Sequence, residues 1–295
     1  MAEFVQMTIN GLVLGTTLAM FVLGFSLLLG VVQIFNMAHA AFYAASGIAI
    51  WWLSQEQDVN YWLAILITMA GMGVIGIIVE RGIYRPFRKD LMSGIVVAMG
   101  FMFFAQGAVS NILQEAGYDL TQKTVPRIID GQMHFLGASI AKERMLIIGI
   151  SVLIILAVIL FLRKTKMGWA VRAIAMDEEA SMLQGIRVGT VSTLIMGVAT
   201  ILVVAAAGLM TPVYGASASG GFDWLMKGMI AIALGGLGSI GGTLWACLIL
   251  GLVQSYAETR IGDHQAIIVL FVILAVILLV RPTGLAGKKV PEEAV

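Results

Sequence analysis

The sequence predicts an all-α, polytopic integral membrane protein with about eight or nine transmembrane helices, some of them broken or re-entrant. Of its 295 residues, 60% are hydrophobic and 12% are charged, with a mean hydropathy of +0.97, whereas soluble domains average about 25% charged residues. The run from Phe4 to Gln55 contains no Asp, Glu, Lys or Arg. Such long apolar blocks favour helices, because a membrane barrel would show short alternating strands instead.

Seven apolar stretches account for the expected crossings, since a helix needs roughly 20 apolar residues to span the bilayer. The clearest single spans are Tyr61–Val79, Leu91–Gln114, Met145–Leu162 and His264–Val280. Phe4–Gln55 suits two spans with a break near residues 31–37, and Val188–Phe222 suits one helix followed by the loop TPVYGASASGG. Gly228–Ala257 suits two short helices that meet at GGLGSIGG.

The distribution of basic residues predicts the orientation, because cytoplasmic loops carry an excess of Lys and Arg. Twelve of the 18 basic residues fall on the side that holds the 80–90 and 163–187 loops and the C-terminus. We therefore expect one transmembrane domain over residues 1–295, with a cytoplasmic loop at about 163–190 and a periplasmic loop at about 115–143. Nine crossings would place the N-terminus outside, and eight would place it inside.

Composition and motifs argue against several classes of function. A net charge of +1 offers no basic field for nucleic acid, and a single cysteine excludes an internal disulfide. The phosphate-binding pattern GxxxxGK[ST], HExxH and paired carboxylates within the spans are all missing. We therefore expect no enzyme activity, cofactor or metal in this chain, and an energy source outside it, because ion-coupled carriers usually need charged groups along their pathway.

The stretch VVQIFNMAHAAFYAAS, residues 31–46, places polar side chains inside an apolar run. On a helix, Asn36, His39, Tyr43 and Ser46 fall within about 80° of one another, and Gln33 precedes them. Polar groups in a membrane usually face the bundle interior or a water-filled path, which indicates a translocation pathway or its gate. Hydrogen bonding between helices, without any substrate contact, explains the same residues equally well.

The glycine-rich stretch LGGLGSIGGTLWA, residues 234–246, indicates a tight helix turn. Gly238-x-x-x-Gly242 has the spacing of a small-residue packing motif. No Lys or Arg lies between Lys227 and Arg260 to meet a phosphate group. The glycines assigned to the turn are Gly235, Gly236, Gly238, Gly241 and Gly242.

Residues 164–191 form a loop of mixed charge with helix-favouring alanines. Acidic residues at 177–179 suit the positive end of a short helix, and Gly185 would end it. Such a helix on the inner face of the membrane could bind a soluble partner, or it could be a solvated connector.

Four motifs, in order, resemble one family along nearly the whole chain: FNMAHAAFY, RAIAMDEEASMLQGI, LGGLGSIGGTLWACLILGLVQS and ILLVRPTGLAGKK. The family comprises the inner-membrane permeases of high-affinity branched-chain amino-acid ABC importers, in particular the shorter, LivH-like partner. The resemblance implies a second homologous permease subunit, two cytoplasmic ATPase subunits that carry ATP and Mg²⁺, and a periplasmic solute-binding protein. It also implies a multi-pass protein of the bacterial inner membrane, surrounded by lipid.

The resemblance assigns roles to particular residues. Glu179-Ala180-Ser181 followed by Gly185 is similar to the importer pattern EAA-x-x-x-G, with Ser181 in place of the second alanine. It implies that Arg172, Asp177, Glu179, Ala180 and Gly185 couple this chain to the ATPase. Near the start of the chain, Asn36, Ala38 and His39 match the family pattern N-x-A-H-G, and Ala40 stands where glycine is common. That match implies a broken or packed helix near the cytoplasmic side of the pathway.

The leading hypothesis is therefore a permease for branched-chain amino acids or a related small solute, such as urea, short amides or aromatic acids. A sugar permease of the ribose type is a rival within transport. A self-contained channel or facilitator for a neutral solute is another, and it would need no ATPase. A membrane enzyme ranks lowest, because no nucleophile–base pair or metal set is found in the sequence.

Overall fold

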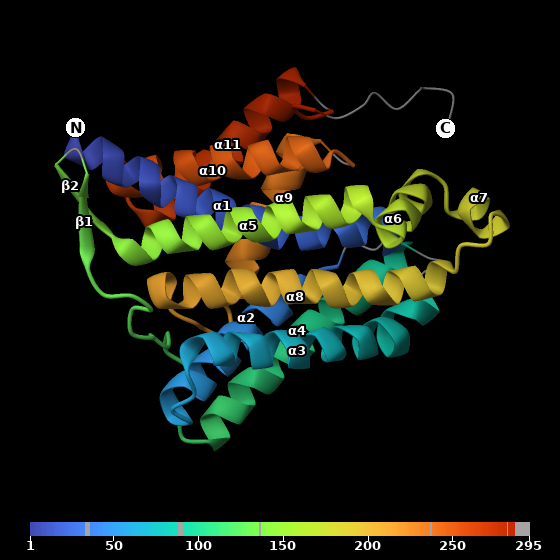
Figure 1. The fold of residues 1–295 in the computed structure, drawn as a ribbon, viewed down its shortest axis with the longest axis horizontal. Helices are drawn as coiled ribbons and strands as arrows, with labels where there is room; N and C mark the ends of the chain where they lie inside the picture. The colour runs from blue at the N-terminus through green and yellow to red at the C-terminus, as the bar shows by residue number, and fades with distance from the viewer. Residues whose placement is uncertain (33–35, 88–90, 136, 237, 282, 287–295) are drawn as a thin grey trace. The chain divides into compact units, whose positions relative to one another are not determined.

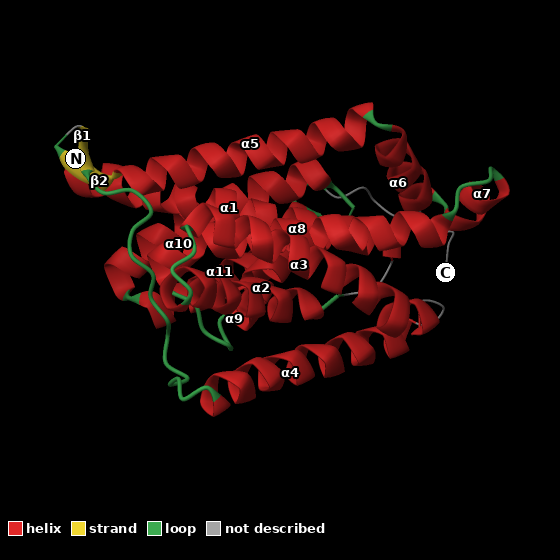
Figure 2. Cartoon of the chain, turned by 60° about the horizontal axis from the view of Figure 1, so that its bottom comes forward, coloured by secondary structure: helices red, strands yellow, loops and turns green. Residues whose placement is uncertain are grey.

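The computed structural model describes residues 1–32, 36–87, 91–135, 137–236, 238–281 and 283–286. Helices account for most of this part of the chain (Figures 1 and 2). They are α1 (Ala2–Val32), α2 (Ala38–Trp51), α3 (Tyr61–Val79), α4 (Leu91–Glu115), α5 (Lys142–Lys164), α6 (Lys166–Met176), α7 (Glu178–Leu183), α8 (Val188–Tyr214), α9 (Gly221–Gly235), α10 (Ile240–Ile261) and α11 (Asp263–Val280). Two π-helical turns, Trp52–Glu56 and Glu80–Tyr84, and a 3₁₀ turn, Arg85–Phe87, extend α2 and α3.

Within the described residues, six helical segments are long and apolar enough to cross a membrane. They are Ala2–Val31, Tyr61–Phe87, Met92–Glu115, Lys142–Lys164, Val188–Tyr214 and Ile240–Ile261. Among the described residues, Gln265–Val280 of α11 is a shorter apolar helix. The prediction of two short helices over Gly228–Ala257 is wrong for the second of them, because α10 has 22 residues and is itself long enough to span. The all-α, polytopic fold class is confirmed, and the broken segments end and restart close to the positions that the apolar runs predict.

The loop between α4 and α5 contains a small hairpin that the sequence patterns do not predict. Strand β1 (Gln132–Phe135) pairs antiparallel with β2 (Ala138–Ala141), with Gln132 opposite Ala141. Each strand has four residues, the shortest length at which alternation indicates a strand, which explains the omission.

The chain folds into two compact units. The first comprises residues 24–128 and 153–225, and the second comprises residues 1–23, 129–152 and 226–295. In the first unit, α8 is the central helix. In its most apolar 18-residue stretch 83% of the residues are buried, compared with 17% in that of α4. Helix α3 packs along α8 (Figure 1). The contact is close because a methyl group on Gly208 would lie 2.9 Å from Ile65, and the Tyr61 hydroxyl donates a 2.7 Å hydrogen bond to the Gly208 carbonyl.

In the second unit, the first half of α1 packs against α10 through glycines. A methyl group on Gly251 would collide with the backbone of Gly11 and Gly15, and one on Gly11 would lie 2.7 Å from Cα of Leu252. Small residues at a membrane helix contact let the two backbones approach and gain dispersion contacts. The glycines in the sequence therefore allow the close packing of α1 on α10.

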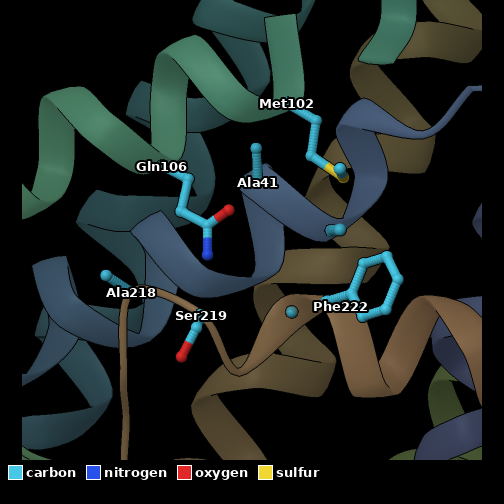
Figure 3. A pocket seen from close by; sticks show the side chains of 8 residues that line it. Ala41, Met102, Gln106, Ala218, Ser219 and Phe222 are labelled. Carbon is cyan, nitrogen blue, oxygen red and sulfur yellow. The ribbon is translucent and has the colours of Figure 1, made fainter. Parts of the chain in front are cut away.

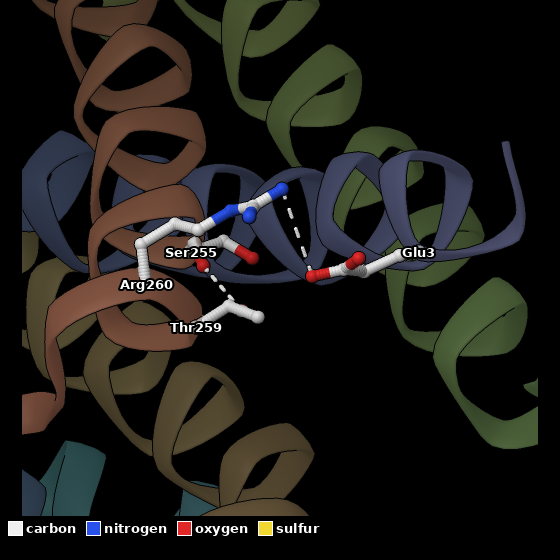
Figure 4. A network of polar contacts seen from close by, with 4 residues as sticks. All are labelled: Glu3, Ser255, Thr259 and Arg260. Atoms are coloured by element: carbon white, nitrogen blue, oxygen red, sulfur yellow. Dashed lines mark hydrogen bonds and ion pairs between the residues drawn. The ribbon is translucent and has the colours of Figure 1, made fainter.

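Polar contacts accompany this α1–α10 packing at the end of α1 that carries the N-terminus. Ser255 Oγ donates to the Met7 carbonyl at 2.8 Å and is buried. Arg260 and Glu3 form an exposed ion pair at 3.7 Å (Figure 4). Exposed pairs contribute only about 0–1 kcal/mol, so the glycine contacts hold these helices together and the ion pair adds little.

Candidate functional site

The residues predicted from the opening stretch lie at and after the break between α1 and α2. Asn36 is buried, and its Oδ1 accepts hydrogen bonds from the Tyr84 hydroxyl at 2.8 Å and from the Ala38 amide at 3.1 Å. Its Nδ2 lies 3.6 Å from the Met196 sulfur. The side chain thus satisfies an amide at the start of α2, which has no backbone partner within the helix, and ties this helix to two others.

The other polar residues predicted from this stretch lie in different surroundings. His39 is fully buried, with its ring edge-on to Phe25 at a centroid distance of 5.6 Å. Tyr43 stacks on Trp224 of α9 at 4.8 Å. Ser46 is buried and donates to the Phe42 carbonyl of its own helix at 2.5 Å. Gln33 lies outside the described residues.

Glu80 is a polar residue that sequence reasoning missed. Its side chain is 0% exposed, within the candidate span Tyr61–Phe87, and its Oε2 accepts a 2.6 Å hydrogen bond from Thr193 of α8. The sequence predicts no paired carboxylates within the spans, and Glu80 is a single buried carboxylate directly after the predicted span Tyr61–Val79. Gly73 and Gly76 also face α8, and the spacing 73, 76, 80 follows one helix face, so this periodicity could have identified Glu80.

The segment between α8 and α9 turns back into the membrane-spanning part of its unit. Helix α8 ends at Gly215, which has a φ of +71°. Helix α9 starts at Gly221, where a methyl group would collide with the carbonyl of Ala40 on α2. A methyl group on Gly24 would meet both Ala199 and the neighbouring His39, at 2.8 and 3.1 Å, which places the first turn of α2 near the middle of α8. Helix α9 therefore begins beside the first turn of α2, near the level of the middle of α8.

A backbone bridge holds the other end of this segment. Lys123 and Ala216 exchange two hydrogen bonds of 2.7 Å, one in each direction. Ala216 also packs in a buried cluster with Ile48, Trp51 and Leu113. The loop after α4, predicted to be periplasmic, is thereby attached to the segment that leads to α9.

A small hollow lies where this segment passes α2 and α4. It has about 180 Å³ of empty space, counting the part open to solvent. Its walls come from three parts of the chain, as Figure 3 shows: Ala40, Ala41, Met102, Gln106, Ala218, Ser219, Gly221 and Phe222. Sequence reasoning did not select these residues, because only the fold brings them together.

The glycine-rich stretch forms the turn between α9 and α10. Gly236 and Gly238 have φ values of +94° and +83°, which favour glycine. Ser239 caps α10 by accepting a 3.2 Å hydrogen bond from the Gly242 amide. Methyl groups on Gly235 or Gly242 would collide with the facing backbone, whereas Gly241 has open space.

The 164–191 loop forms α6 and α7. Arg172 donates a 2.5 Å hydrogen bond to the Leu162 carbonyl at the end of α5, and Asp177 caps α7 by accepting from the Ala180 amide at 2.9 Å. Gly185, with a φ of +82°, ends α7. Glu179 and Ala180 are exposed on α7. Of the five residues predicted to couple to the ATPase, Arg172, Asp177 and Gly185 thus stabilise the shape of α6 and α7. Glu179 and Ala180 expose their side chains at the surface.

Multiple long apolar helices place this chain among polytopic membrane proteins. It belongs to the family described as branched-chain amino acid transport system, permease component, which matches residues 7–281. The resemblance inferred from the four motifs is thus confirmed, and the chain is a multi-pass permease of the inner membrane.

Two curated relatives cover nearly the whole chain. BraD of Pseudomonas aeruginosa, a high-affinity branched-chain amino acid transport system permease protein, is 29% identical over 306 residues, which are 99% of this chain and 98% of that protein. LivH of Escherichia coli K12, described in the same words, is 30% identical over 305 residues, 98% and 97% of the two chains.

One solved structure shares the fold. It is PsaBC from Streptococcus pneumoniae in complex with Fab, with a TM-score of 0.51 and 12% identity over 91% of this chain and 89% of that one. At this identity the likeness supports the fold alone.

Proposed function

We propose that this chain is the permease subunit of an ABC importer that moves branched-chain amino acids or a closely related small solute into the cytoplasm. The observation that carries the proposal is the family match over residues 7–281, joined by relatives of about 30% identity whose names specify branched-chain amino acids. In this function the chain performs no chemistry. It forms part of a path that opens alternately to the two sides of the membrane.

ATP hydrolysis belongs to separate subunits in this proposal. The sequence lacks GxxxxGK[ST], the pattern whose backbone amides and lysine hold nucleotide phosphates. ATP and Mg²⁺ are accordingly bound by two cytoplasmic ATPase subunits. A periplasmic binding protein delivers the solute, and a second homologous permease completes the path.

The α6–α7 element is the surface proposed to contact an ATPase subunit. Met176 and Leu183 are 88% and 87% exposed there, and Trp169 is also exposed. Large apolar side chains grouped on a charged, predicted cytoplasmic loop favour protein contact over free solvation. Glu179 and Ala180 present their side chains on the same element, while Arg172, Asp177 and Gly185 hold its shape.

The opening stretch supports the architecture of the path in this proposal. The Asn36 side chain accepts hydrogen bonds from the Ala38 amide and the Tyr84 hydroxyl at the start of α2. Such internal partners are required in a membrane because its core offers no water. Direct contact of these residues with substrate is not needed to explain their positions.

The test is purification of the tagged chain from mild-detergent extracts, followed by mass spectrometry and uptake measurements in liposomes. We expect two P-loop ATPases and a second permease to co-purify, and ATP-dependent uptake of leucine, isoleucine or valine when the binding protein is added. A chain that purifies alone and conducts solute without ATP would contradict the proposal and indicate a facilitator.

A further inference from the structure

Glu80 carries a buried carboxyl group of which only one oxygen is hydrogen-bonded. Its Oε2 accepts the 2.6 Å hydrogen bond from Thr193 of α8. Its Oε1 is equally enclosed and accepts no hydrogen bond from the described residues. Burying a polar group costs free energy unless it is hydrogen-bonded, so a group left in this condition calls for an explanation. The burial of Glu80 therefore indicates a role beyond stability.

Glu80 begins the π-helical turn Glu80–Tyr84, which follows α3 directly. The Arg85 amide donates to the Glu80 carbonyl and closes this turn. Single π-helical turns frequently occur at functional sites. Both terminal side chains of the turn are buried, since Glu80 is 0% and Tyr84 is 1% exposed. The turn thus places two polar side chains inside the first unit.

The two ends of the turn bind different helices. Tyr84 donates a 2.8 Å hydrogen bond to Oδ1 of Asn36, the same oxygen that accepts from an amide at the start of α2. Glu80 instead accepts from Thr193. Met196, whose sulfur lies 3.6 Å from Nδ2 of Asn36, follows Thr193 by three residues and shares its face of α8. The turn therefore connects the start of α2 with the first part of α8.

The first part of α8 also adjoins α6 and α7, and both of these helices pack on α8. Helix α8 begins at Val188, shortly after Gly185 ends α7. The Ile186 amide in this short connection donates a 3.1 Å hydrogen bond to the Ser181 carbonyl of α7. Thr193 lies within about the first two turns of α8. A displacement of α7 thus reaches Thr193 through a short, hydrogen-bonded stretch of chain.

We propose that the Glu80–Tyr84 turn is a relay that transmits movement of α6 and α7 to the start of α2, an inference that rests on the proposed function. When an ATPase subunit displaces α7, the first part of α8 moves with it. The hydrogen bond from Thr193 makes the turn follow α8, and the hydrogen bond to Asn36 makes the start of α2 follow the turn. Glu80 and Tyr84 are positioning residues in this relay, which requires no contact with the solute.

The second carboxyl oxygen of Glu80 has a specific use in the relay. A carboxyl group has acceptor sites on both oxygens, whereas a hydrogen bond holds only over a narrow range of distances. Thr193 therefore exchanges from Oε2 to Oε1 when α8 shifts, and the contact persists in both positions. This exchange explains why Oε1 is buried with no partner among the described residues.

Thr193→Val and Tyr84→Phe test the relay, because each variant keeps the shape of the side chain and removes one hydroxyl donor. Leucine uptake and ATP hydrolysis are measured on the complete complex in proteoliposomes. We expect each variant to consume about fivefold more ATP per leucine transported, which is the change in population that one buried hydrogen bond supports. The double variant should be no more impaired than the worse single variant, since both bonds belong to one series of contacts.

Two control variants separate transmission from packing. Thr68→Val removes a buried hydroxyl that donates to the Ala64 carbonyl of its own helix at 2.8 Å. Tyr61→Phe removes the 2.7 Å hydrogen bond to the Gly208 carbonyl, which also joins α3 to α8 but lies at the other end of α3. We expect Tyr61→Phe to lower the midpoint of thermal unfolding as much as Tyr84→Phe does. Both controls should keep the wild-type ratio of ATP consumed to leucine transported.

Glu80→Gln tests the exchange between the two carboxyl oxygens. Glutamine has one acceptor oxygen in place of two, so it accepts from Thr193 in only one position of α8. We expect the midpoint of thermal unfolding to stay near the wild-type value and leucine uptake to fall by about fivefold or more.

The outcomes separate the relay from the proposed function. An unchanged ATP-to-leucine ratio in either Thr193→Val or Tyr84→Phe, or an equal rise in Tyr61→Phe, would overturn the relay while ATP-dependent uptake by the wild type still upheld the function. Multiplied effects in the double variant would indicate two independent contacts and overturn it as well. Normal uptake by Glu80→Gln would overturn the exchange between the oxygens. Absence of ATP-dependent uptake by the wild-type complex would overturn the proposed function, and the relay with it.

Discussion

The ammonium group of Lys123 lies 4.9 Å from the centre of the Trp51 ring and 5.3 Å from that of Tyr118. Cation–π contacts of this kind contribute about 0.5–1 kcal/mol at exposed sites. The Glu56 carboxylate accepts a hydrogen bond from the Tyr118 hydroxyl, which raises the pKa of that hydroxyl above its usual value. Since the Lys123 backbone also pairs with Ala216, this cluster attaches the loop after α4 to the segment that leads into α9.

Gly215→Ala should loosen that attachment. Gly215 has a φ of +71°, and a methyl group there would lie 2.7 Å from Cγ of Gln122 and 2.9 Å from the Lys123 carbonyl oxygen. Positive φ alone costs a side-chain-bearing residue about 1–2 kcal/mol. We expect a lower midpoint of thermal unfolding in detergent and reduced uptake. Gly117→Ala is the control, because Gly117 has a φ of +80° with open space around it. Equal losses in the two variants would show that the close contact has no role.

Gly251→Ala should weaken the α1–α10 contact. The added methyl group would collide with backbone atoms of Gly11 and Gly15, which no side-chain rotation can relieve. Overpacking of this kind typically costs about 1–3 kcal/mol. Gly100→Ala on α4 has no atom within 4 Å to meet and should be neutral or slightly stabilising. Thermal unfolding of both variants in detergent is the measurement, and an unchanged midpoint for Gly251→Ala would contradict this packing.

Glu80→Ala should destabilise the junction of α3 and α8. It removes the acceptor of the 2.6 Å hydrogen bond from Thr193 and leaves a space at a fully buried position. The expected loss is about 1–3 kcal/mol. Glu80→Gln retains a carbonyl oxygen at the same place and should keep most of the stability. If the two variants unfold at the same temperature, the hydrogen bond is not what Glu80 contributes.

Glu179→Lys should abolish transport while leaving the protein in the membrane. Glu179 is exposed on α7, so its replacement disturbs no described contact within the chain and reverses one charge on the proposed coupling surface. Gln184→Lys adds a lysine at another exposed position just beyond the helix and should be tolerated better. The measurements are membrane yield by immunoblot, leucine uptake and retention of the ATPase subunits in a pull-down. Normal uptake by Glu179→Lys would remove this residue from the coupling surface.

The sequence by itself determined the class of fold, the long helices and the family. Runs such as Tyr61–Val79 must form helices in lipid, because only internal hydrogen bonding satisfies their backbones. The glycines at 235–242 and Gly185 mark helix ends, since local backbone geometry is set by local residues. The four motifs that indicate the family are likewise contiguous in the chain.

Tertiary structure alone decided which polar groups meet. The sequence places Glu80 at the start of a loop, whereas in the structure the π-helical turn Glu80–Tyr84 follows α3 directly and the Glu80 carboxylate accepts a hydrogen bond from Thr193. Gln106 and Ser219 look unremarkable in sequence, and they come together only because the chain returns from Gly215 to Gly221 beside α2. The physical reason is that a hollow is lined by residues distant in sequence, and helix periodicity specifies a face of each helix without specifying its neighbour.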